Sequence, residues 1–423
     1  METERERAVL AGLSADIMDF AERSSEESLD ELEALVETAG GVCMARVLQV
    51  RPAPDPHSFI GAGKVDELKA LIEANDCTLA VFDNELSPSQ TRALEDELGV
   101  RVIDRSVLIL DIFAQRARTR EGRLQVELAQ YKYLLPRLTG MWTHLVRQTS
   151  SASPIGTRGP GETQLETDRR HIRRKIDKLS SELQEVRKNR STQRRQRRKN
   201  GVPVAALVGY TNAGKSTLLN CLTGAGIHAA DRLFDTLDTT TRRLDLSPVR
   251  QILISDTVGF INKLPHHLIE AFKATLEELT YADVLLHVID VSNPHWRQQA
   301  EVVEKLIAQL GAETTPCIRV YNKCDLAPLE FIPHEELSVR ISAKTGEGTD
   351  DLLRTIAQVL DRGTKREVLH LPYERSDLLD LIHRHCEVLR TEYLDTCTEI
   401  ETVIPAEYYG LLKPFVFDKE QDL

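Results

Sequence analysis

The sequence predicts a multidomain α/β protein with a doubly wound sheet domain, an N-terminal α/β subdomain, a helical hairpin and a small C-terminal α+β appendage. Strand-like apolar runs alternate with helical patterns over 41–110 and again over 201–363, which is typical of α/β layers. Between these regions, apolar residues step by four and three along two segments, as in paired helices. We therefore expect domains at 1–110, 111–200, 201–363 and 364–423.

Composition and length fit a folded protein of several domains. The chain has 423 residues, of which 41% are hydrophobic and 28% charged, and domains average roughly 100–200 residues. No apolar run reaches the roughly 18 residues of a membrane span, and the charged N-terminus lacks the pattern of a secretory signal. Seven scattered cysteines, none in CxxC spacing, argue against a disulfide framework or zinc site. We expect a reduced, cytoplasmic monomer.

Charge is distributed unevenly along the chain. The net charge of −12 comes from −13 over 1–110, +13 over 111–200 and −12 over 201–423. One basic segment in an acidic protein indicates a local contact with a polyanion. The alternative is a highly charged helix exposed to solvent.

The N-terminal region alternates strands with helices over a short span. We expect strands at 41–50, 77–83 and 100–104, and helices at 29–36, 64–75 and 87–99. Ser87 and Pro88 form a start signal for the third helix, and Gly99 is a stop signal. Such a succession in one small region implies a parallel α/β layer.

The basic segment predicts an antiparallel helical hairpin. Leu124, Leu128, Tyr131, Leu135 and Leu138 form one seam, and Ile172, Ile176, Leu179, Leu183 and Val186 form the other. A Gly-, Pro- and Ser-rich loop spans 139–161, and the second helix runs over 162–199. The basic residues expected to contact RNA phosphates without reading sequence are Arg158 at the tip and Arg194, Arg195, Arg197, Arg198 and Lys199 at the helix end.

A phosphate loop lies between an apolar strand and a helix start. Gly209-x-x-x-x-Gly214-Lys215-Ser216 has the spacing at which backbone N–H groups surround phosphates at a helix N-terminus. Lys215 would reach the β- and γ-phosphates, and the Ser216 hydroxyl would bind Mg²⁺. The alternative is a tight strand-to-helix turn.

Three later motifs complete a GTP site in the order and spacing of a P-loop GTPase domain. Asp256-Thr257-Val258-Gly259 follows an apolar strand, where Asp256 would hold Mg²⁺ through water and the Gly259 N–H would sense the γ-phosphate. Asn322-Lys323-Cys324-Asp325 supplies a carboxylate for the donor groups of guanine. Ser342-Ala343-Lys344 would support the base. The residues expected to bind the nucleotide are Gly209, Tyr210, Thr211, Asn212, Ala213, Gly214, Lys215, Ser216, Thr217, Phe234, Asp235, Thr236, Leu237, Asp238, Asp256, Thr257, Val258, Gly259, Asn322, Lys323, Cys324, Asp325, Ser342, Ala343 and Lys344.

A Thr-rich loop over 234–242 is expected to supply a hydroxyl to Mg²⁺ in the triphosphate state. Thr236 is our choice, with Thr239 and Thr240 as alternatives. Phe260 follows the Asp-Thr-Val-Gly motif, where many GTPases place a Gln that orients water, and Phe cannot donate or accept that hydrogen bond. The catalytic group is therefore unknown from sequence, and we expect a partner to stimulate hydrolysis.

The chain resembles the HflX GTPases over essentially its whole length. The residues that carry the resemblance are PIGTRGPGETQLETDRR at 154–170, GYTNAGKST, FDTLDTTTR, DTVGFI, FIGAGK at 59–64 and LLPRL at 134–138. The resemblance implies binding to the large ribosomal subunit, with the hairpin loop directed toward the peptidyl-transferase region, and a role in dissociating stalled ribosomes under stress. Ser153-Pro154 departs from the family pattern before Ile-Gly, and the proline stiffens the tip of the loop at this point.

Alternatives to ribosome rescue share most of these residues. One is a GTP-gated factor for ribosome assembly or sequestration. Another is an ATP-driven RNA remodeller that uses the FIGAGK loop, although this loop lacks a complete phosphate-binding motif. We favour a structural turn or an RNA contact for that loop. His266-His267 is interpreted as an exposed polar turn rather than a catalytic pair.

Overall fold

The computed structural model describes residues 5–19, 22–141, 160–199, 202–224, 233–234, 236–237, 240–247, 250–263, 268, 279–327, 333, 335–361, 365–404 and 406–417. The chain forms two compact units. The first comprises Met1–Lys188 with Ala229–Asp238 and Val258–Leu276, and the second comprises Asn189–His228, Thr239–Thr257 and Glu277–Leu423. Two short segments of the region 201–363 are therefore grouped with the N-terminal part of the chain.

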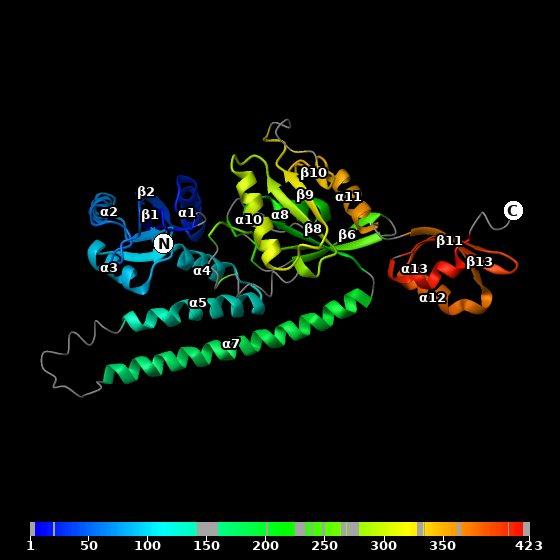
Figure 1. The fold of residues 1–423 in the computed structure, drawn as a ribbon, viewed down its shortest axis with the longest axis horizontal. Coiled ribbons are helices and arrows are strands. Elements are labelled where there is room, and N and C mark those ends of the chain that lie inside the picture. The colour runs from blue at the N-terminus through cyan, green and yellow to red at the C-terminus, as the bar shows by residue number, and fades with distance from the viewer. Residues whose placement is uncertain are drawn as a thin grey trace. The chain divides into compact units, whose positions relative to one another are not determined.

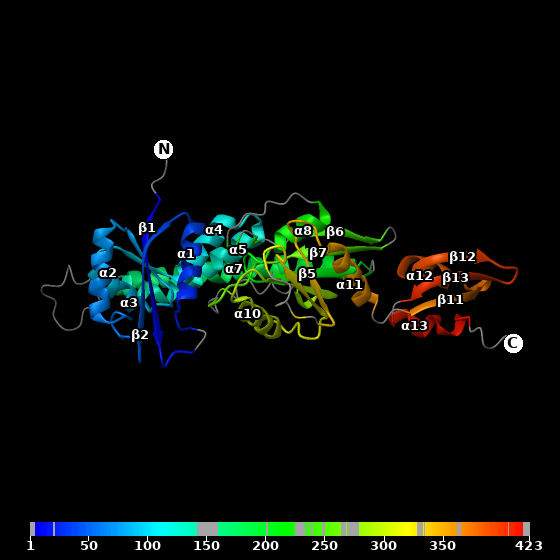
Figure 2. The ribbon, with the colours of Figure 1, turned by 90° about the horizontal axis from the view of Figure 1, so that it is seen from above.

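A parallel four-stranded sheet forms the centre of the first unit, in the order β2-β1-β3-β4. Figure 2 shows α2 and α3 on one side of this sheet and α1 and α4 on the other. The elements are β1 (Arg7–Ala15), α1 (Glu26–Ala39), β2 (Val42–Arg51), α2 (Ala62–Ala74), β3 (Leu79–Phe82), α3 (Pro88–Leu98), β4 (Arg101–Asp104) and α4 (Arg105–Arg116). The predicted parallel α/β layer is confirmed.

Local sequence signals set most of these boundaries. Ser87 caps α3 by accepting the Gln90 N–H, Pro88 occupies the first turn, and Gly99 ends the helix at a φ of 71°. The strand β1 was not predicted, because its apolar run directly follows a strongly charged start. It is nevertheless central, with β2 on one side and β3 on the other. Buried Val9, Leu10 and Leu13 lie on it.

The helical hairpin consists of α5 (Arg120–Met141) and α7 (Pro160–Lys199), which run side by side in Figure 1. The predicted seam is confirmed, since buried Leu124 and Leu128 cluster with Leu179 and Leu183. The Tyr133 hydroxyl donates to Asp104 Oδ2 at 2.9 Å and so attaches α5 to the sheet. Residues 194–199 lie on α7, whereas Arg158 lies outside the described residues.

A six-stranded sheet forms the centre of the second unit, in the order β10-β9-β8-β5-β7-β6. Neighbouring strands are parallel except for β6, which pairs antiparallel with β7 at one edge. The elements are β5 (Val204–Gly209), α8 (Lys215–Thr223), β6 (Thr240–Ser247), β7 (Arg250–Asp256), β8 (Val284–Asp290), α10 (Trp296–Gln309), β9 (Cys317–Asn322), β10 (Ser338–Arg340) and α11 (Thr349–Asp361). The predicted doubly wound P-loop fold is confirmed.

The C-terminal part contains a three-stranded antiparallel sheet in the order β11-β13-β12 (Figure 2). Its elements are β11 (Lys365–Pro372), η2 (Tyr373–Arg375), α12 (Ser376–His385), β12 (Glu387–Tyr393), β13 (Cys397–Ile404), α13 (Ala406–Leu412) and η3 (Lys413–Phe415). The pattern of residues 376–390 predicts a single helix, and this prediction is wrong at its end. The helix stops at His385, and Glu387–Tyr393 becomes a strand because it pairs with β13.

His287 on β8 gives the second unit a built-in pH dependence. Burial lowers the pKa of His287 to about 3. The unfolded chain therefore binds a proton near pH 6.5 that the folded state excludes, and stability falls as the pH drops below 6.5. Between pH 6.5 and 5, this protonation should lower the unfolding free energy of the wild-type protein by about 2 kcal/mol. We expect the His287→Asn variant not to show this loss. Urea unfolding at both pH values, with exposed His383→Asn as control, checks this. An unchanged pH dependence would contradict it.

No helix among the described residues is long and apolar enough to cross a membrane.

Candidate nucleotide site

The phosphate loop joins the end of β5 to the start of α8. Glycine is required at both ends of the motif. A Cβ at Gly209 would lie 2.3 Å from the Val288 carbonyl oxygen, and Gly214 has a φ of 93° with the Asn322 amide 2.3 Å from its missing Cβ. The loop therefore passes close to the neighbouring strand and then turns through a left-handed residue into the helix. This geometry directs the backbone N–H groups of the loop and the positive N-terminal end of α8 toward the same point, where a phosphate can bind.

Lys215 is held inside this loop. Its side chain is 6% exposed, and Nζ donates to the carbonyl oxygens of Gly209 at 3.1 Å and Tyr210 at 2.8 Å. Burial lowers the pKa of Lys215 to about 8, while nearby Asp256 partly opposes the shift. The ammonium is thus positioned in a largely dry loop, where its attraction for a phosphate is strong.

Ser216 and Asp256 form the oxygen pair expected at a Mg²⁺ site. The Ser216 hydroxyl donates to Asp256 Oδ2 at 2.7 Å, which joins the start of α8 to the end of β7. Thr257 Oγ1 donates to the Leu207 carbonyl at 2.6 Å and fixes the next residue against β5. Mg²⁺ prefers oxygen ligands and usually takes only one or two from protein side chains beside phosphates. The donor set fits this ion, and the described residues hold no cluster of three or more His, Cys, Asp or Glu suited to another metal.

Asn322 joins three of the predicted motifs. Its Nδ2 donates to the Ala213 carbonyl at 2.8 Å, and its Oδ1 accepts the Ala343 N–H at 2.9 Å. The phosphate loop and the Ser342-Ala343 loop therefore meet at one buried amide. Lys323 follows with a φ of 63° and forms an ion pair with Asp290 at 2.6 Å. Asp325 remains exposed at the surface beside this junction.

Several residues of the predicted nucleotide site belong to the first compact unit. Phe234 and Leu237 are buried, and Thr236 is half-buried. Val258 and Phe260 are also buried, with Phe260 only 1% exposed. Asp235, Asp238 and Thr239 lie outside the described residues, as do His266 and His267, whereas Thr240 begins β6.

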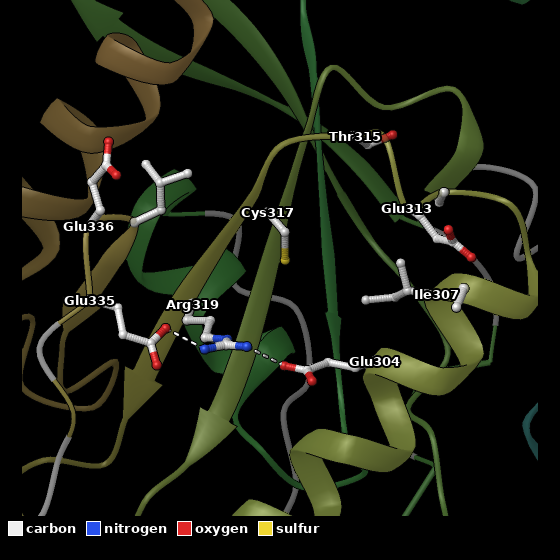
Figure 3. A pocket seen from close by; sticks show the side chains of 11 residues that line it. Glu304, Ile307, Glu313, Thr315, Cys317, Arg319, Glu335 and Glu336 are labelled. Atoms are coloured by element: carbon white, nitrogen blue, oxygen red, sulfur yellow. Dashed lines mark hydrogen bonds and ion pairs between the residues drawn. The ribbon is translucent and has the colours of Figure 1, made fainter.

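A separate pocket lies between α10 and the β9–β10 edge. It has a volume of about 450 Å³, and none of the predicted nucleotide-binding residues lines it. Figure 3 shows Arg319 extended between Glu304 and Glu335, with which it forms ion pairs. Because both carboxylates already neutralise this guanidinium, the pocket has no basic group directed at a phosphate.

The FIGAGK segment forms a turn that opens α2. Asp55 and Phe59 exchange backbone hydrogen bonds of 2.8 and 3.0 Å, and Phe59 is buried with a φ of 65°. The Gly61 N–H donates to Gln49 Oε1 at 2.8 Å, so this helix-start N–H is already satisfied. Lys64 pairs with Glu67. The geometry is that of a structural turn.

A phosphate loop, an Asp-Thr-Val-Gly segment and an Asn-Lys-Cys-Asp junction on one doubly wound sheet define a GTP-hydrolysing enzyme of the P-loop class. Family models agree: residues 26–114 match a GTP-binding GTPase N-terminal region, 116–197 its middle region, and 204–323 a 50S ribosome-binding GTPase. The chain belongs to the HflX family of GTPases.

Relatives match nearly the full chain. This chain is 45% identical over 414 residues to the GTPase HflX of Caldanaerobacter subterraneus subsp. tengcongensis, and the alignment covers 98% of this chain and 94% of the relative. It is 45% identical over 366 residues to GTPase HflX of Escherichia coli K12, covering 85% of each. Among solved structures, the SsGBP and GDP complex is 25% identical with a TM-score of 0.47, covering 84% of this chain and 99% of that one.

Sequence reasoning missed one polar cluster, which lies beside the Phe260 segment in the first unit. Asp83, Arg105 and Lys263 form buried ion pairs there. The available signal was the position of Asp83 at the carboxyl end of a predicted parallel strand, where polar side chains gather in α/β folds.

Proposed function

We propose that this GTPase binds the large ribosomal subunit through its hairpin and dissociates or rescues stalled ribosomes in the cytoplasm. The observation that carries the proposal is the concentration of positive charge, +13 over 111–200, in the segment that contains the helical hairpin. An extended basic hairpin can follow an RNA groove while the acidic remainder stays in solvent. The description of the family model over 204–323 as a 50S ribosome-binding GTPase supports the same partner.

The nucleotide site supports GTP and Mg²⁺ as the bound pair. We propose that the phosphate-loop N–H groups and Lys215 hold the phosphates, and that Ser216, Thr236 and, through water, Asp256 hold Mg²⁺, which would neutralise phosphate charge. The Gly259 N–H would contact the γ-phosphate. Asp325 would accept the guanine donors, and the Asn322 junction would keep the base-binding and phosphate-binding loops together.

The end of α7 provides a direct test of the RNA contact. We expect simultaneous replacement of Arg194, Arg195, Arg197 and Arg198 by Gln to weaken binding to purified large subunits. Each lost phosphate contact lowers the slope of log affinity against log salt by about 0.7–0.9, so four should lower it by about 3. GTP affinity should not change, because none of these residues belongs to a nucleotide motif.

Sedimentation across a salt series measures this slope. Matched replacement of four basic residues outside the hairpin, Arg354, Arg366, Arg384 and Arg390, controls for loss of net charge. If the α7 variant binds with an unaltered slope, the basic helix end is a solvated surface and the proposed contact is wrong.

A further inference from the structure

The segment that follows Gly259 in the chain belongs to the first compact unit, together with the N-terminal sheet. Within this unit, Lys263 forms an ion pair with Asp83, and its Nζ donates to Ser24 Oγ at 3.3 Å. The neighbouring Asn262 carbonyl accepts a hydrogen bond of 3.1 Å from Arg105 Nη2. Three N-terminal side chains therefore hold two consecutive residues of this segment.

These contacts are deeply buried. The side chains of Asp83, Arg105 and Lys263 are 0%, 2% and 9% exposed. Arg105 donates to Asp83 Oδ1 at 2.8 Å, and the hydroxyls of Ser24 and Ser28 donate to Oδ2 at 2.7 and 2.8 Å. Burial by itself raises the pKa of Asp83, but Arg105 and Lys263 outweigh it and hold the pKa below its usual value. The Asp83 carboxylate is thus ionised, and both of its oxygens accept hydrogen bonds.

The position of this cluster is informative. Asp83 directly follows β3, and Arg105 follows β4, so the cluster lies at the carboxyl edge of the parallel N-terminal sheet. Parallel α/β sheets bind their ligands at this edge. Here the edge is occupied by Lys263, a residue of the same chain that lies four positions after Gly259.

The backbone is also held in an uncommon conformation. Lys263 has a φ of 53°, which a residue with a side chain adopts only when its surroundings enforce it. Buried ion pairs add little net stability, because desolvation offsets their attraction, and they are best understood as fixing one arrangement over others. The arrangement fixed here is that of the Phe260–Lys263 segment.

The other nucleotide-responsive loop is attached to the same unit. The rings of Phe234 and Phe113 on α4 meet edge to face, with centroids 4.8 Å apart. Phe234 is buried and has a φ of 55°. Both segments that are expected to change with the γ-phosphate are therefore anchored on N-terminal side chains.

We propose that Lys263 is a positioning residue for GTP hydrolysis, which holds the segment after Gly259 in its reactive arrangement through its buried ion pair with Asp83 at the carboxyl edge of the N-terminal sheet. Through this contact the N-terminal region sets the hydrolysis rate. Because Phe260 offers no polar group, catalysis depends on the placement of backbone and neighbouring groups, and small displacements are costly. The proposal rests on GTP hydrolysis and not on ribosome binding.

The test is single-turnover and steady-state GTP hydrolysis by the full-length Lys263→Met protein without ribosomes. Met retains the aliphatic stem and leaves Asp83 paired with Arg105, so the fold should persist. We expect kcat to fall about tenfold or more, while KM and GDP affinity stay within about twofold. Lys69→Met, on the exposed surface of α2, is the matched control and should behave as wild type.

Two further measurements separate positioning from general destabilisation. Asp83→Asn should also lower kcat. The double variant with Lys263→Met should lose little more activity than Asp83→Asn alone, because both substitutions remove the same contact. Amide exchange over 258–263 should accelerate in both variants, whereas exchange over β5 should not. An unchanged or raised kcat in soluble, folded Lys263→Met would overturn the proposal. So would full additivity of the two substitutions.

Discussion

Replacing Lys215 with Ala is expected to lower GTP turnover by a factor of about 10²–10³. The ammonium lies inside the phosphate loop, donates to two of its carbonyl oxygens and is surrounded by little water. Removing a preorganised charge from such a site costs about 10²–10³ in rate. The loss should appear in both triphosphate affinity and kcat, since the proposed contact of Lys215 with the phosphates would act in the ground state and in the transition state.

Hydrolysis assays and binding of a fluorescent GTP analogue measure the two effects. Lys305→Ala on the exposed face of α10 is the matched control. This variant also tests the ATP alternative. If ATP turnover survived Lys215→Ala and disappeared in Lys64→Ala, the FIGAGK turn would be a second nucleotide site and the assignment of activity to the phosphate loop alone would be wrong.

Replacing Asp325 with Asn is expected to change base preference from guanine to xanthine. A carboxylate accepts hydrogen bonds from the ring N–H and the exocyclic amino group of guanine. Xanthine carries a carbonyl in place of that amino group, so an Asn amide, which can donate, complements it. A site built around hydrogen bonds discriminates strongly against a ligand that leaves them unpaired, so GTP affinity should fall by about a hundredfold or more.

Competition between GTP and xanthosine triphosphate checks this preference. Asp350→Asn, in the exposed first turn of α11, controls for loss of one negative charge. A variant that still prefers GTP would show that Asp325 does not contact the base, and the guanine-binding role of the Asn322–Asp325 motif would need another residue.

Motifs with a fixed backbone requirement were predictable from sequence. Gly214 must adopt a positive φ, and Ser87 and Gly99 delimit a helix by local hydrogen bonding, so each acts within a few residues. The hairpin seam was predictable for a similar reason, because Leu128 and Leu183 lie on regular helical stripes. Such signals depend little on the rest of the fold.

Features that depend on distant pairing were not predictable. The charged residues before β1 hid the central strand, which is defined by its neighbours in the sheet. Glu387–Tyr393 has a pattern compatible with a helix, and pairing with β13 makes it a strand. Lys263 and Asp83 are 180 residues apart, so no local pattern could connect them.

The central claim is that the GTPase is coupled to the large ribosomal subunit. It is tested most directly by GTP hydrolysis with and without purified large subunits, alongside sedimentation of intact ribosomes with a non-hydrolysable GTP analogue. We predict strong stimulation by the subunit, and splitting of ribosomes by the analogue-bound protein. Stimulation without splitting would favour an assembly or sequestration factor. Absence of stimulation would contradict the claim. It would also leave unexplained how water is oriented when Phe260 replaces the usual Gln.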